Sequence, residues 1–123
     1  MAERSRQSED MRVRTKQFAL RIIRLVNSLP KSMVAREIGK QLVRSGMSVG
    51  SNYRAACRGR SAAEFRAKLG IVEEEADESA FWMELLVEAK IVPMQRLADL
   101  LDEANQLVAM TIASIQTSRK RRT

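Results

Sequence analysis

The fold is decided by the sequence Arg44-Ser45-Gly46-Met47-Ser48-Val49-Gly50-Ser51-Asn52-Tyr53-Arg54-Ala55-Ala56-Cys57-Arg58-Gly59-Arg60-Ser61, residues 44–61. Its first part has the pattern of the second half of a long helix, and its last residues form a tight turn and the start of the next helix. Small residues fall on one side of the helix and arginines on the other. This arrangement predicts two helices in close contact and a basic surface that faces solvent.

The helix that contains this segment is expected to run from about Met33 to Arg58, with Ser32 as its N-cap. Gly39, Gly46 and Gly50 lie inside it, and each is less favourable there than alanine by up to about 1 kcal/mol. A close approach by a neighbouring backbone, which small residues allow, would offset that loss. We therefore predict that this glycine face packs against another helix.

Proline, glycine and capping residues indicate the other helix boundaries. Pro30 ends the preceding helix, because the residue before a proline avoids the α region. Gly59 is expected to stop the helix in a left-handed conformation. Ser61-Ala62-Ala63-Glu64 forms a capping box that begins a helix running to about Lys90. Pro93 is expected in the first turn of the last helix, where its missing N–H is not needed.

Each expected helix carries apolar residues at a spacing of three and four, the pattern of one buried helical face. The stripes are Phe18, Ile22, Leu25, Val26 and Leu29; Ile38, Leu42, Ser45, Val49, Asn52, Tyr53 and Ala56; Phe65, Leu69, Val72, Ala76, Ser79, Ala80, Met83, Leu86 and Val87; and Leu97, Leu101, Ala104, Val108, Thr111, Ile112 and Ile115.

Four such helices joined by short turns predict an all-α fold, an antiparallel up-down-up-down four-helix bundle. The 123 residues are expected to form a single domain. Residues 1–10 and 118–123 are polar and are expected to be flexible tails, with Ser8 or Asp10 as the N-cap of the first helix.

Composition excludes several classes of function. The chain has no histidine and one cysteine, Cys57, so a histidine-based catalytic site is impossible and a structural zinc site is not expected. No matched acid and base is evident, so we expect no enzyme and no cofactor. The sequence contains neither a membrane span nor the apolar segment of a signal peptide, which favours the cytoplasm.

The charge is distributed unevenly. The net charge is +10 over residues 1–60, −5 over residues 61–90 and +2 over residues 91–123. A basic excess confined to one part of the chain favours a polyanionic partner. The basic residues opposite the inner stripe of the second helix, and in the turn after it, are Arg36, Lys40, Arg44, Arg54, Arg58 and Arg60. They form either a solvated face that maintains solubility or a surface that contacts nucleic-acid phosphates.

The third helix has a second apolar group away from its inner stripe. At 100° per residue this outward group consists of Ile71, Phe81, Trp82 and Leu85. A group of this kind on one outward face is unusual for a monomer. We expect it to form an oligomer interface, and the alternative is that helix ends and loops cover it.

Three other features have structural interpretations. The acidic run 73–78 resembles a carboxylate metal site, but a di-metal bundle needs Glu-x-x-His pairs, so ion pairs with basic helices of the same or a neighbouring subunit are expected instead. Asn52 needs a hydrogen-bond partner if buried, and Ser48 and Glu73 are the candidates. Cys57 has no neighbouring base and is expected to pack rather than react.

Several segments together resemble a known family. These are Gln41-Leu42-Val43-Arg44-Ser45-Gly46-Met47-Ser48-Val49-Gly50-Ser51-Asn52, then Arg60-Ser61-Ala62-Ala63-Glu64-Phe65, then residues 70–78, and Leu29-Pro30 at the first turn. The resemblance covers about residues 15–117 and is to bacterial four-helix bundle proteins, the 23S rRNA intervening-sequence or S23 family. The accessory protein of diversity-generating retroelements is similar.

The resemblance implies a homopentameric barrel with a basic outer surface and no known enzymatic activity. In the retroelement relatives, the barrel binds nucleic acid and the reverse transcriptase. Family members often carry an acidic residue and a glycine soon after the position of Asn52, whereas this chain has Tyr53-Arg54-Ala55-Ala56-Cys57 there. We therefore expect a non-enzymatic homo-oligomer that binds RNA or DNA with little sequence specificity. The alternative is an assembly or adaptor protein whose basic face binds a protein such as a reverse transcriptase.

Overall fold

The computed structural model describes residues 2–121, with side chains from Ser8 onwards. It contains four long helices, and their bounds are α1 Ala2–Asn27, α2 Met33–Cys57, α3 Ala62–Glu88 and α4 Met94–Lys120. No strand occurs within residues 2–121. The predicted all-α class is therefore confirmed. Among the helices that the structure describes, none has both the length and the apolar character of a membrane span.

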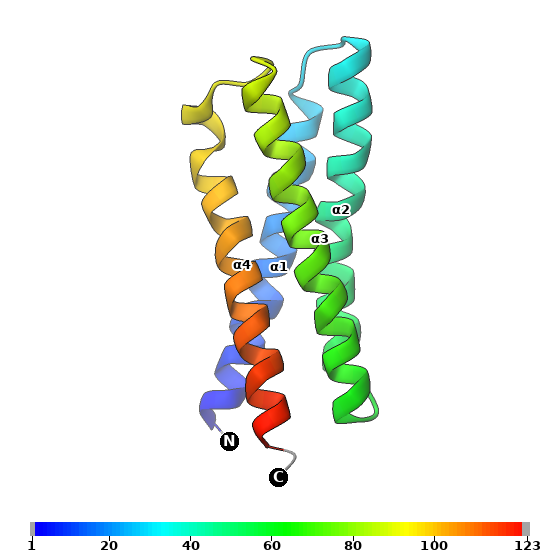
Figure 1. The fold of residues 1–123 in the computed structure, drawn as a ribbon, viewed down its shortest axis with the longest axis vertical. Helices are drawn as coiled ribbons and strands as arrows, with labels where there is room; N and C mark the ends of the chain where they lie inside the picture. The colour runs from blue at the N-terminus through cyan, green and yellow to red at the C-terminus, as the bar shows by residue number, and fades with distance from the viewer. Residues whose placement is uncertain (1, 122–123) are drawn as a thin grey trace.

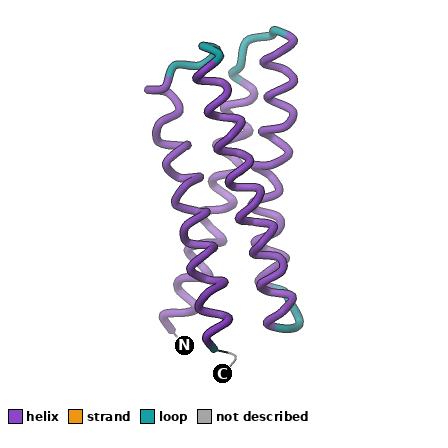
Figure 2. Tube along the Cα trace, viewed as in Figure 1, coloured by secondary structure: helices purple, strands orange, loops and turns teal. Residues whose placement is uncertain are grey.

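The helices alternate in direction and form an antiparallel four-helix bundle (Figure 1). α2 packs against α1 and α3, and α3 packs against α4, while α1 and α4 make the loosest contact between adjacent helices. The three connecting segments are short, as the teal segments in Figure 2 show. Both chain ends lie at the same end of the bundle as the α2–α3 turn.

The predicted caps of α2 and α3 are confirmed. The Ser32 hydroxyl accepts a hydrogen bond from the backbone N–H of Ala35 at 3.2 Å, and the Ser61 hydroxyl accepts one from that of Glu64 at 3.1 Å. In the second half of the capping box, the Glu64 carboxylate accepts from the backbone N–H of Arg60 rather than from that of Ser61. Both helices therefore start where short polar side chains satisfy free N–H groups.

The start of α1 differs from the prediction. α1 begins at Ala2, so neither Ser8 nor Asp10 is its N-cap. The polar residues before Met11 extend the helix, which the sequence pattern did not indicate because they carry no apolar stripe. The stretches 1–10 and 118–123 are helical as far as Ala2 and Lys120, and their flexibility stays a prediction; Met1, Arg122 and Thr123 lie outside the described residues.

Two chain-reversal residues behave differently from the prediction. Gly59 does not adopt a left-handed conformation; a side chain there would lie 3.1 Å from the backbone nitrogen of Phe65 and 3.2 Å from the carbonyl oxygen of Ala56. Close approach of backbone, rather than a positive φ, therefore favours glycine at this turn. Pro93 precedes α4 as its N-cap and is not inside its first turn.

The left-handed conformation occurs instead at Lys90, with φ of 61°, just after α3. The backbone N–H of Lys90 donates to the carbonyl of Val87 at 3.0 Å, and that of Ile91 donates to the carbonyl of Leu86 at 2.9 Å. This pair of hydrogen bonds is the Schellman pattern that closes a helix C-terminus. Lysine occupies the position where glycine is usual, so no residue pattern indicated a left-handed conformation here.

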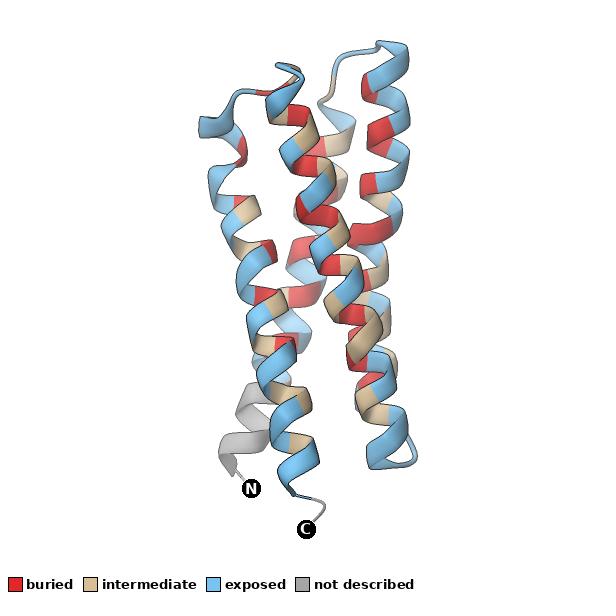
Figure 3. Ribbon diagram, viewed as in Figure 1, coloured by how far each residue is buried: buried red, intermediate tan, exposed pale blue. Residues whose placement is uncertain are grey.

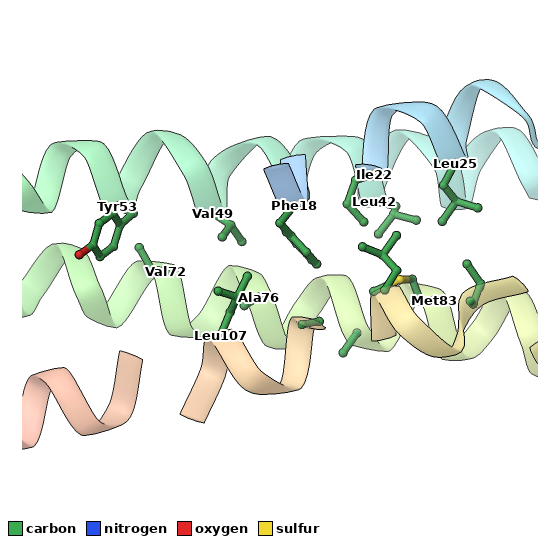
Figure 4. Close-up of a cluster of buried hydrophobic side chains, with 14 of the residues drawn as sticks. Phe18, Ile22, Leu25, Leu42, Val49, Tyr53, Val72, Ala76, Met83 and Leu107 are labelled. Atoms are coloured by element: carbon green, nitrogen blue, oxygen red, sulfur yellow. The ribbon is translucent and has the colours of Figure 1, made fainter. Parts of the chain in front are cut away.

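The core runs along the axis of the bundle, where buried residues of all four helices meet (Figure 3). In Figure 4, Phe18 and Ile22 of α1 point toward the same interior as Val49 of α2 and Met83 of α3. Each of the four predicted stripes supplies most of the buried residues of its helix. Burial of these side chains is the main source of the bundle's stability.

The stripe of α4 is confirmed in part. Leu97, Ala104 and Thr111 are buried as predicted, and Leu100 and Leu107 are buried although the prediction did not include them. Leu101, Val108 and Ile115 are half-buried, and Ile112 is exposed. Both sets follow helical spacing, so periodicity alone could not separate them; the neighbours of α4 decide which of two adjacent faces is buried.

The predicted packing of the glycine face against another helix is confirmed, and the structure shows that this helix is α1. A side-chain carbon built at Gly46 would lie 2.8 Å from two carbons of Ile22, and one built at Gly50 would lie 3.3 Å from the backbone oxygen of Thr15. At Gly39 the corresponding distance is 3.1 Å to Val26. The two helices therefore come so close together that only glycine fits at position 46.

Candidate nucleic-acid interface

All six predicted phosphate-contacting residues are exposed. Four of them lie on α2, and Arg58 is its C-cap; at 100° per residue these five project within one 80° arc. Between Arg36 and Arg58 they span about 33 Å at 1.5 Å per residue. The sixth, Arg60, follows in the α2–α3 turn. α2 thus carries its basic face opposite the face that packs on α1 and α3, as the sequence predicted. We call this set of six residues the basic stripe.

Arg44, in the middle of the basic stripe, is paired with carboxylates of α3. Its guanidinium lies 3.5 Å from Glu75 and donates a hydrogen bond to Glu78. Glu78 also accepts from the indole N–H of Trp82 at 3.2 Å. Desolvation, followed by repulsion from Glu78, raises the pKa of Glu75, because burial and a neighbouring negative charge disfavour its ionised form.

The arginines at the two ends of the stripe are less engaged. Lys40 lies 3.5 Å from Glu37, an exposed pair that contributes little. Among the residues with described side chains, Arg36, Arg54, Arg58 and Arg60 have no ion-pair partner. Two separate groups of available cations therefore flank Arg44, and the group formed by Arg54, Arg58 and Arg60 is the denser.

The four outward apolar residues of α3 are unequally exposed. Phe81 has 51% of its surface exposed, whereas Ile71, Trp82 and Leu85 are half-buried. The rings of Phe81 and Trp82 are in edge-to-face contact, with centroids 5.1 Å apart. The exposed part of this group is therefore centred on Phe81, which Trp82 holds in place.

The structure confirms one of the two partners expected for Asn52 and contradicts the expected packing of Cys57. Asn52 is half-buried and donates to both the carbonyl and the hydroxyl oxygen of Ser48, at 3.0 and 2.7 Å; the alternative partner, Glu73, does not take part in these bonds. Cys57 is exposed rather than packed, and its sulfur lies 3.5 Å from the Ser8 hydroxyl. Burial raises the pKa of Tyr53 to about 12.

No cluster of three or more potential ligands that could hold a metal ion occurs among the described residues. Of the acidic run 73–78, Glu75 and Glu78 are the members that pair with a basic helix, through Arg44. Their partner belongs to the same chain, one of the two arrangements that the sequence left open.

Sequence analysis missed a charged cluster between α1 and α4. Arg14 donates to both carboxylate oxygens of Glu103, at 3.0 and 2.7 Å, and to Gln106 at 2.9 Å. The hydrogen bond to Glu103 raises the pKa of Arg14. The two helices are far apart in the sequence, so no local pattern could have indicated this contact.

Comparison with known proteins agrees with this architecture. The sequence model of the family described as 23S rRNA-intervening sequence protein matches residues 9–113. The chain belongs to that family. The predicted resemblance is thereby confirmed over most of the chain.

A solved structure is also similar. It is the crystal structure of a protein with unknown function from the S23 ribosomal protein family of Bacteroides thetaiotaomicron, with a TM-score of 0.83 and 28% sequence identity. The match covers 89% of this chain and 97% of that one. No curated protein matches the sequence.

Proposed function

We propose that this family member is a non-enzymatic homo-oligomer that binds RNA or DNA through the basic stripe of α2, with little sequence specificity. The observation that carries the proposal is the exposure of Arg36, Arg54, Arg58 and Arg60 on one side of the bundle, without ion-pair partners among the described side chains. Such cations are available to phosphates, which supply most of non-specific nucleic-acid affinity.

The composition of the stripe also supports low specificity. It contains no aromatic side chain on which a base would stack, and its arginines project from a straight helix rather than from a groove-reading motif. Backbone contacts position a nucleic acid but do not read its sequence. The family name, which refers to an intervening sequence of 23S rRNA, makes RNA the first ligand to test.

A charge-neutralised variant tests the proposal. In Arg36→Gln/Arg54→Gln/Arg58→Gln, we expect the affinity for a labelled single-stranded RNA to fall at least about tenfold at low salt. The slope of log K against log salt should become less negative by about 2, since each lost phosphate contact contributes about 0.7–0.9. Fluorescence anisotropy over a salt titration measures both quantities.

The control carries the same change in net charge elsewhere. Lys31, Lys68 and Arg119 are exposed and lie outside the stripe. In Lys31→Gln/Lys68→Gln/Arg119→Gln, we expect less than about a threefold loss of affinity. An equal loss in both variants, or no binding by the wild type at low salt, would refute binding through the stripe.

We further propose that Phe81 is at the centre of the oligomer interface, together with Ile71, Trp82 and Leu85. An aromatic side chain held half in solvent by Trp82 is the kind of anchor that interfaces use. By the family resemblance we expect a pentamer. Repetition of the basic stripe on each subunit would then multiply the charge that a nucleic acid meets.

Light scattering on Phe81→Ser tests the interface. We expect the wild type to have the mass of five chains of 13.9 kDa, and the variant to dissociate. Ile112→Ser is the control, since Ile112 is also an exposed apolar residue but lies on α4. A monomeric wild type, or a Phe81→Ser oligomer as stable as the control, would contradict this interface.

The second candidate function is an adaptor whose basic face binds an acidic protein partner such as a reverse transcriptase. Arg44 favours it, because its pairing with Glu75 and Glu78 shows that this face accepts carboxylates. Capture of partners with and without nuclease separates the two functions. Partners bridged by nucleic acid are lost on nuclease treatment, whereas an acidic protein is retained.

A further inference from the structure

A cavity of about 630 Å³ lies at the end of the bundle that carries the α2–α3 turn. Its lining comes from α1, α2 and α3, from the turn itself and from the last turns of α4. At this end, the ends of α1 and α4 stand apart from the α2–α3 turn (Figure 1). The volume is within the usual range of sites for small organic molecules.

The inner wall of the cavity is apolar. Met11 and Tyr53 line it and are 3% and 5% exposed, so they belong to the core. Phe65 of α3 and Met110 of α4 line it as well and are half-buried. Aromatic rings and thioethers of this kind suit a flat, polarisable group, since aromatic and sulfur-containing side chains pack favourably against a ring face.

The rest of the lining is cationic and rich in hydroxyls. Arg60 and Arg121 both line the cavity, and none of the aspartates and glutamates with described side chains does. The hydroxyls of Ser114 and Thr117 also line it and form no hydrogen bond with the described residues. The lining therefore complements a ligand with a flat apolar part, groups that accept hydrogen bonds and a negative charge.

The cavity and the basic stripe have one residue in common, Arg60. Arg54 lies in the last turn of α2 and Arg58 is its C-cap, and neither lines the cavity, whereas the next two residues, Gly59 and Arg60, do. Arg60 thus belongs both to the stripe and to the cavity. A strand that follows the stripe toward the α2–α3 turn would reach the cavity with its backbone phosphates on the arginines.

We propose that the cavity takes one unpaired nucleotide of a nucleic-acid strand bound along the basic stripe, with its base against Phe65 and Met110 and its phosphate on Arg60 and Arg121. This inference rests on the proposed nucleic-acid binding and adds to it a preference for single strands. A paired base is stacked in its duplex and cannot enter, whereas an unpaired base can be splayed out.

Filling the cavity tests the proposal. Ala113 is exposed and lines the cavity, so Ala113→Trp places a large side chain there without disturbing the core. We expect its affinity for a labelled single-stranded 12-mer RNA to fall about tenfold, because base stacking is lost. Its affinity for a blunt 12-base-pair duplex should change less than about twofold, because the duplex uses the stripe alone.

The matched control is Ala109→Trp, one turn earlier on α4, at an exposed residue outside the cavity lining. It should bind both probes as the wild type does. Ser114→Leu is the second cavity variant and is used if circular dichroism shows that Ala113→Trp fails to fold. Equal single-strand binding by wild type and both cavity variants would overturn the cavity proposal and leave binding through the stripe intact. A wild type that binds neither probe would overturn both.

Discussion

The α1–α2 seam and the α1–α4 seam hold the same helix by different means. Along α1–α2, Gly46 lets the backbones come so close that a single added carbon would touch Ile22 at 2.8 Å. Along α1–α4, the helices contact less, and Arg14 spans the gap to Glu103. The comparison shows that steric fit fixes one side of α1 and a charged cluster fixes the other.

The largest effect is expected from a substitution of Gly46 in the α1–α2 contact. Gly46→Ala should lower the free energy of unfolding by about 2–3 kcal/mol, because overpacking outweighs the gain in helix propensity. The atoms that the new carbon would meet include the Cβ of Ile22 at 2.9 Å, so rotating the isoleucine cannot relieve the contact. Urea denaturation measures the change, and a variant as stable as the wild type would contradict the seam.

The next largest effect is expected from a substitution of Arg14 in the α1–α4 contact. Arg14→Ala should lower the free energy of unfolding by about 1–2 kcal/mol, since it leaves the half-buried carboxylate of Glu103 without its bidentate partner. A double-mutant cycle with Glu103→Gln isolates the pair, and we expect a coupling of at least about 0.5 kcal/mol. Additive single effects would show that Arg14 acts through packing alone.

A smaller effect, an increase in stability, is expected from substitution of a glycine that has no close neighbour. A side chain at Gly70 on α3 would meet nothing within 4 Å. Gly70→Ala should therefore raise the free energy of unfolding by about 0.5–1 kcal/mol through helix propensity and reduced freedom of the unfolded chain. Paired with Gly46→Ala in the same denaturation series, it separates contact from propensity. Destabilisation by Gly70→Ala would mean that this face of α3 is occupied.

The smallest effect concerns the α2–α3 contact. The pKa of Glu75 is raised in the folded protein, mainly by burial, so its ionised form opposes folding at neutral pH. That unfavourable contribution is full above the folded-state pKa and fades as pH falls through it. Glu75→Gln should therefore raise the melting temperature slightly at pH 7 and should show a smaller difference near pH 4. A loss of stability at pH 7 would show that attraction to Arg44 outweighs desolvation.

Sequence patterns were sufficient where one local interaction decides the structure. Ser32 and Ser61 each cap the helix that follows, because the bond joins residues three apart. Sequence patterns were insufficient at the chain reversals. There, Gly59 allows other backbone atoms to approach closely, and Lys90 adopts the left-handed conformation. At such positions, contacts with other segments compete with intrinsic preference.

The same distinction applies to the candidate interface. Helical geometry alone placed the stripe's residues before the α2–α3 turn on one side of α2, and the structure keeps all six residues of the stripe exposed. Helical geometry alone could not show that Arg44 is paired with Glu75 and Glu78, since those residues lie on the next helix. Nor could it indicate the cavity at the α2–α3 turn, which forms only where all four helices meet.

By itself, the sequence determined that this chain forms four helices, where most of them begin and end, and that the glycine face of α2 packs against another helix. These properties follow from spacing, caps and side-chain size, which act over a few residues. Only the tertiary structure decided that the buried face of α4 includes Leu100 and Leu107, which arginines are paired and where a cavity remains. Each of these depends on which residues, distant in the sequence, the packed helices bring within a few ångströms of one another.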